Sequence, residues 1–110
     1  VHSERSPEEL RGHPLSISGL QTWIALPDAR EEMAPAFEHT VRRDLPEFAD
    51  GGASGRVVMG GFQGLASPVT GYSDTLYADI RLEAGASIDI PADGHDLALM
   101  AHGRTSSWWA

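Results

Sequence analysis

The start of the chain carries the side chains best suited to chemistry. His2 and Glu4 lie two positions apart, so on an extended strand both side chains leave the same face and can converge on one cation. An imidazole and a carboxylate that leave coordination positions open suit non-haem Fe(II) or a similar divalent ion. A stable site needs at least three protein ligands, so a third would come from His13, in a loop before Pro14, or from another chain.

The alternative is that His2 and Glu4 form a solvated chain end that holds no metal. His95 and His102 flank residues 97–101, and their spacing places them on opposite faces of a regular strand, so they are not expected to share an ion. Surface positions are expected for all the remaining histidines, which are His13, His39, His95 and His102.

Composition excludes several other classes of function. The net charge of -8 repels phosphate backbones, so direct binding of nucleic acid is disfavoured. The chain contains neither Cys nor Lys and has no Gly-X-Ser-X-Gly motif, which argues against a thiol nucleophile, a phosphate-binding loop and a nucleophile elbow. No apolar run is long enough to span a membrane or act as a signal sequence, so we expect a cytoplasmic protein without a membrane segment.

Residues 19–27, GLQTWIALP, give the clearest strand pattern in the chain. The alternation predicts two faces, with Leu20, Thr22, Ile24 and Leu26 on one and Gln21, Trp23 and Ala25 on the other. Both faces carry bulky side chains, so the pattern predicts a central strand that is covered on two sides, either between packed sheets or against a partner chain. Trp23 is accordingly predicted to be a core residue.

Further short elements follow, separated by Gly and Pro. We expect a connector at 28–33, a short strand at 36–41, a turn at 44–48, a surface loop at 50–55 and a strand with a bulge at 56–62. Residues 75–82 alternate regularly, which predicts that Leu76, Ala78, Ile80 and Leu82 point inward. Strands are also expected at 86–90 and 97–101. Short strands at this spacing predict an all-β sandwich or barrel in a single domain.

These residues resemble the pirin family of two-barrel cupins. The likeness lies in residues 19–27 with Met33 and Pro35, in Ser67-Pro68-Val69, and in residues 76–79 leading to 84–86. It covers residues 1 to about 103 and implies a single pirin-like domain over 1–110 with a cupin-type β-barrel or sandwich fold. Residues 1–35 resemble the end of the first barrel and the connector, residues 36–103 the start of the second, and 104–110 a divergent tail.

The resemblance also implies a metal site. In this family a metal, usually iron, is held by three His and one Glu; His2 and Glu4 match the last His and the Glu, while the earlier His pair would lie upstream of residue 1. His102 stands where the family often has an acidic residue. This departure removes a plausible metal ligand and does not add one. Some members show quercetin 2,3-dioxygenase activity on a small aromatic substrate, and others act as transcriptional cofactors.

Three functions therefore stay open. The first is a metal-dependent dioxygenase, the second is metal-assisted hydrolysis of an ester or lactone at the same site, and the third is a non-catalytic interaction module. Partial barrels expose strand edges, so we expect a homo-oligomer that pairs through these edges. Trp108 and Trp109, in the divergent tail, are expected to dock on this chain or on a neighbour because they are too apolar to lie free in water.

Overall fold

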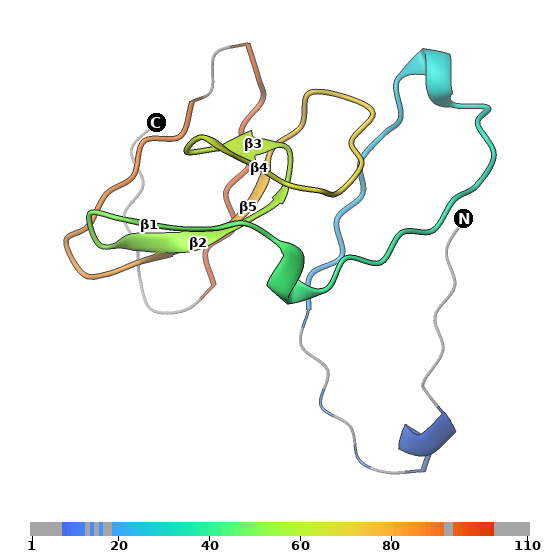
Figure 1. Ribbon diagram of the computed structural model, residues 1–110, viewed down its shortest axis with the longest axis horizontal. Helices are drawn as coiled ribbons and strands as arrows, with labels where there is room; N and C mark the ends of the chain where they lie inside the picture. Colours follow the sequence, from blue (N-terminus) through green and yellow to red (C-terminus); the bar gives the residue numbers. More distant parts are fainter. Residues whose placement is uncertain (1–7, 13, 15, 17–18, 92–93, 103–110) are drawn as a thin grey trace.

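The strands of the described residues lie between residues 47 and 82. The computed structural model describes residues 8–12, 14, 16, 19–91 and 94–102. In this part, three single-turn 3-10 helices, η1 (Glu8–Leu10), η2 (Asp28–Arg30) and η3 (Arg42–Asp44), precede the strands β1 (Glu47–Asp50), β2 (Ala53–Met59), β3 (Gly61–Phe62), β4 (Leu65–Ala66) and β5 (Tyr77–Leu82) (Figure 1). The prediction of an all-β fold is confirmed. No helix among these residues has the length and apolar character that a membrane span requires.

A three-stranded antiparallel sheet forms the centre of the fold, in the order β1-β2-β5. β1 and β2 form a hairpin whose two loop residues, Gly51 and Gly52, have φ values of 54° and 83°. Two positive φ values in a two-residue loop are typical of a type I′ turn, whose twist matches that of the flanking strands. Glu47 and Phe48, predicted in a turn at 44–48, belong to β1, and residues 53–55, predicted in a loop at 50–55, belong to β2. Both predictions are therefore wrong, because the Gly-Gly pair closes a hairpin.

Gly55 lets the three strands approach each other at the middle of β2. It pairs with Phe48 on one side and Ile80 on the other. A Cβ at this position would overlap the carbonyl oxygen of Asp79 and lie 2.9 Å from Cζ of Phe48. The absence of a side chain at Gly55 thus makes room for the Phe48 ring. This explains why a glycine, which usually weakens a strand, stands in the middle of β2.

The predicted strand at 56–62 with a terminal bulge is confirmed in outline. The pairing of β2 with β5 shifts register between Val57 and Met59, and Gly60 follows with a φ of 76°. This irregularity ends the main sheet and directs the chain into the short β3–β4 hairpin. The predicted strand at 75–82 is confirmed over Tyr77–Leu82 as β5, where Ala78, Ile80 and Leu82 are half-buried and Asp79 and Arg81 are exposed. The inward position predicted for Leu76 is wrong, because this residue precedes the strand and is exposed.

The hydrophobic core is small and lies between the sheet and the β3–β4 hairpin. The buried apolar residues are Phe48, Ala53, Val57 and Phe62. The rings of Phe48 and Phe62 meet edge to face, with centroids 5.3 Å apart, a favourable arrangement for aromatic pairs. Leu65, Ile80, Ile88 and Ile90 pack around this core. Residues 86–90 form no strand, contrary to expectation, although Ile88 and Ile90 face the core as the alternation predicts.

The prediction that residues 19–27 form a central strand is wrong. They form no strand, and in Figure 1 this part of the chain runs within a long loop to one side of the strands. Leu20 is 63% exposed and Trp23 is 81% exposed, so Trp23 is not a core residue. Period-two alternation is a local property, whereas a strand also needs a neighbour that supplies backbone hydrogen bonds and covers its faces. In the described part of the chain no strand pairs with residues 19–27.

Two other predicted strands fail for the same reason. Residues 36–41 and 97–101 are not strands. Phe37 is 92% exposed, and Met100 is 67% exposed. The connector predicted at 28–33 is confirmed, because it contains only the single turn of η2. The predicted docking of Trp108 and Trp109 lies outside the described residues.

Candidate functional site

The predicted metal ligands, His2, Glu4 and His13, lie outside the described residues. His39, His95 and His102 are exposed, as the sequence predicts. Across residues 8–12, 14, 16, 19–91 and 94–102, no group of three or more His, Asp or Glu side chains is placed to hold a metal ion. The ligand set predicted at the start of the chain therefore stays a prediction.

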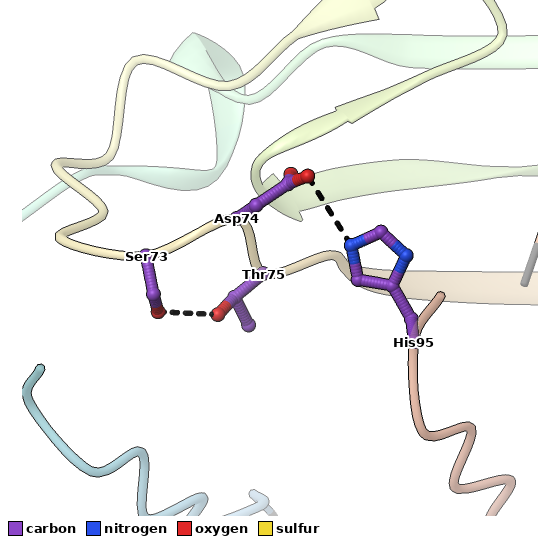
Figure 2. Close-up of polar contacts among 4 residues, drawn as sticks. All are labelled: Ser73, Asp74, Thr75 and His95. Atoms are coloured by element: carbon purple, nitrogen blue, oxygen red, sulfur yellow. Dashed lines mark hydrogen bonds and ion pairs between the residues drawn. The ribbon is translucent and has the colours of Figure 1, made fainter. Parts of the chain in front are cut away.

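One polar cluster joins two distant loops (Figure 2). Nε2 of His95 lies 3.2 Å from Oδ2 of Asp74, and these side chains are 48% and 95% exposed. On either side of Asp74, the hydroxyls of Ser73 and Thr75 share a hydrogen bond of 2.8 Å. No sequence pattern indicates this contact, because Asp74 and His95 are 21 positions apart and no spacing rule relates them.

The chemistry open to this cluster is limited. In Figure 2 the Asp74 side chain points toward the imidazole, while Ser73 and Thr75 point away from it. A hydroxyl nucleophile needs a base within hydrogen-bond reach, and here the hydroxyls bond to each other instead. One carboxylate and one imidazole are also too few protein ligands for a stable metal site. We interpret the cluster as a surface contact that ties the two loops together.

Two cavities lie against the strands. The smaller, of about 160 Å³, places residues 24–26 beside Met59 and the loop 70–73. The guanidinium of Arg30 lies 5.9 Å from the centroid of the Tyr72 ring, within the range of a cation–π contact. These contacts hold one end of the loop that contains residues 19–41 against the second half of the chain. The larger cavity, of about 420 Å³, lies between the β3–β4 hairpin and residues 89–91.

No protein-family model matches the chain, and no solved structure matches it significantly. Curated relatives do match. A pirin-like protein of Caulobacter vibrioides is 38% identical over 106 residues, which are 94% of this chain and 36% of the relative. A candidate quercetin 2,3-dioxygenase of Pseudomonas aeruginosa is 33% identical over 96 residues, covering 86% of this chain and 28% of the relative. Human pirin is 28% identical over 91 residues, with coverages of 83% and 30%.

The chain therefore spans about a third of the length of these relatives. Their names agree across bacteria, a plant and mammals. The matches extend over most of this chain, and the described residues show the strand-dominated architecture that a cupin requires. The division at residue 35 into parts of two barrels stays a prediction. The fold is all-β and of cupin type, and the chain belongs to the pirin family.

Proposed function

We propose that the chain is part of a metal-dependent dioxygenase of the quercetin 2,3-dioxygenase type, with Fe(II) as its metal and a small aromatic substrate. The observation that carries the proposal is the similarity to the candidate quercetin 2,3-dioxygenase of P. aeruginosa, which extends over 86% of this chain. The chemistry of His2 and Glu4 supports it, because a neutral imidazole and a carboxylate are donors that Fe(II) accepts.

His2 and Glu4 would hold the metal, with His13 as a further ligand. The imidazole of His2 must be neutral to donate its nitrogen, and the carboxylate of Glu4 offsets part of the positive charge of the ion. A bound redox-active ion with open positions would supply the capacity to react with dioxygen. Because two or three protein ligands leave the ion much of its water shell, we expect weak occupancy in an isolated copy.

We further propose that two copies associate through open strand edges and complete the ligand set. β1 and β5 are the outer strands of the main sheet, so each has one edge without a ladder partner in the described part. Residues 19–27 add an apolar segment with no charged side chain, so two copies can meet there without like-charge repulsion. If association brings the two chain starts together, metal binding and dimerisation stabilise each other.

The test is to titrate Fe(II), Mn(II) or Zn(II) into the wild-type chain and into His2→Ala, Glu4→Ala and His39→Ala. Bound metal, thermal midpoint and mass by light scattering are followed together at several protein concentrations. We expect His2→Ala and Glu4→Ala to lose metal uptake and the associated stabilisation, while His39→Ala, a change at an exposed histidine, behaves as wild type. Equal uptake by all four proteins would remove the basis for the dioxygenase proposal.

A non-catalytic interaction module is the second candidate function. It is favoured by the exposed apolar side chains that precede β1, above all Trp23 at 81% and Phe37 at 92% exposure. Exposed apolar surface of this kind is typical of binding surfaces. The same titration separates the two candidates, because an interaction module would associate with equal strength with and without metal.

A further inference from the structure

The larger cavity has walls suited to a small organic ligand. It has a volume of about 420 Å³ and is lined by Phe62, Leu65 and Pro91, by Gln63 and Asp89, and by the glycines Gly61 and Gly64. Ligand sites in proteins combine apolar walls with a few polar groups and have volumes of roughly 300–1,000 Å³. The cavity is open to solvent, because most of its lining residues are exposed and only Phe62 is buried. A ring that carries a substituent can therefore lie in it with one side facing water.

Gln63 occupies a backbone position that does not suit it. It is the one non-glycine residue with positive φ, at 53°, among the described residues, and Gly64 follows at 74°. The two form the loop of the β3–β4 hairpin, and loops of this kind favour Asn, Asp or Gly at the first position. The β1–β2 hairpin of the same chain has Gly51 and Gly52 in the matching positions. A long amide side chain thus stands at a strained position that lines the cavity, and such strain is concentrated at ligand sites.

Asp89 gives the cavity its charge. Residues 86–90 alternate, so that Ile88 and Ile90 pack against the core while Asp89 is exposed and lines the cavity. It is the only charged residue among the described residues that line the cavity. The chain as a whole carries a net charge of -8, which favours the approach of cations. The charge and the apolar walls together select a ligand with a positive group on an apolar body.

We propose that this cavity binds a small organic cation, a ring that carries an ammonium group. The ring packs against Phe62, Leu65 and Pro91, and the ammonium group donates hydrogen bonds to the Asp89 carboxylate and the Gln63 amide oxygen. A charge-assisted hydrogen bond of this kind is stronger than one between neutral groups. No proposed metal ligand is among the described residues that line the cavity, so this proposal does not depend on a bound metal.

The test compares three probes of equal size: benzylammonium, benzyl alcohol and benzoate. Binding is followed through the backbone amide resonances of Gly61, Gly64 and Leu65 at constant ionic strength. We expect saturable shifts with benzylammonium, at least tenfold weaker binding of benzyl alcohol, and no binding of benzoate. Absence of saturable shifts with benzylammonium, or equal shifts with benzylammonium and benzoate, would overturn the proposal.

Variants distinguish binding in the cavity from a general attraction of cations to an acidic protein. Asp89→Asn should weaken benzylammonium binding about tenfold or more, while Asp50→Asn, the same change at an exposed residue that does not line the cavity, should leave it unchanged. Gln63→Asn suits the turn better and shortens the side chain, so it should weaken binding while keeping the thermal midpoint or raising it. Equal losses in Asp89→Asn and Asp50→Asn would attribute the binding to net charge and refute the proposed site.

Discussion

Truncation of two aromatic side chains tests how the chain divides into a packed part and an exposed part. Phe62 is 5% exposed and contacts Phe48 in the core, whereas Trp23 is 81% exposed. Truncation of a fully buried Phe or Trp to Ala costs about 3–5 kcal/mol, because the change removes apolar burial and leaves a cavity. Phe62→Ala should therefore cost close to this full amount.

The cost of Trp23→Ala follows from its exposure. Only about a fifth of the residue is covered, since 81% of it is exposed. Scaled by this fraction, the loss is about 0.6–1 kcal/mol, with little added cost from a cavity. For a chain of this size 1 kcal/mol corresponds to about 4–8 °C in thermal midpoint. We therefore expect a fall of at least about 12 °C for Phe62→Ala and of less than about 8 °C for Trp23→Ala.

Urea and thermal unfolding of both variants, followed by far-UV circular dichroism, give the comparison. The measurements are made at low and high protein concentration, because burial of Trp23 by a second copy would appear only at the higher one. Equal losses for the two variants at every concentration would refute the reasoning, since Trp23 would then be buried within one copy. A loss that grows with concentration for Trp23→Ala alone would support the proposed association.

Two further predictions concern the sheet and the surface cluster. Gly55→Ala should destabilise the chain by about 1–3 kcal/mol or more, since the new methyl group meets backbone at Asp79. Gly71→Ala, whose nearest Cβ neighbour would be at an ordinary 3.5 Å, is the matched control, and a similar thermal midpoint for the two variants would contradict the close approach of β2 to β5. Asp74→Asn should change stability by less than about 1 kcal/mol, because its contact with His95 is exposed. It should also leave metal uptake unchanged, and a large loss of bound metal in titrations would show that the cluster contributes to the metal site.

The sequence predicts strands well where a clear residue pattern coincides with a partner strand that the fold supplies. β5 alternates regularly and β2 carries β-branched residues, and these two strands pair with each other. Burial on one face and exposure on the other then follow from the pleat. The hairpin around Gly51 was missed because its strands contain small or polar residues, and Gly55 is needed there for the close approach of the Asp79 backbone and the Phe48 ring.

Other features depend on contacts that a sequence pattern does not contain. Residues 19–27 alternate as regularly as β5, yet the described part supplies no strand beside them. The Asp74–His95 contact joins loops that only the fold brings together. The larger cavity likewise arises from the packing of residues 89–91 near the β3–β4 hairpin. In all three cases the residues can be found in the sequence, but the contacts that the fold makes or withholds cannot.

The exposed segment before β1 presents an energetic problem. Ordering the backbone costs about 1–2 kcal/mol per residue, and burial of apolar side chains is the main term that offsets this cost. Leu20 at 63% and Phe37 at 92% exposure contribute little of it. Residues 19–27 carry apolar side chains and no charge, so they gain most when another surface covers them. Ordering of this segment and association with a covering surface should therefore be a single, coupled event, which is why we expect metal binding, association and stability to change together.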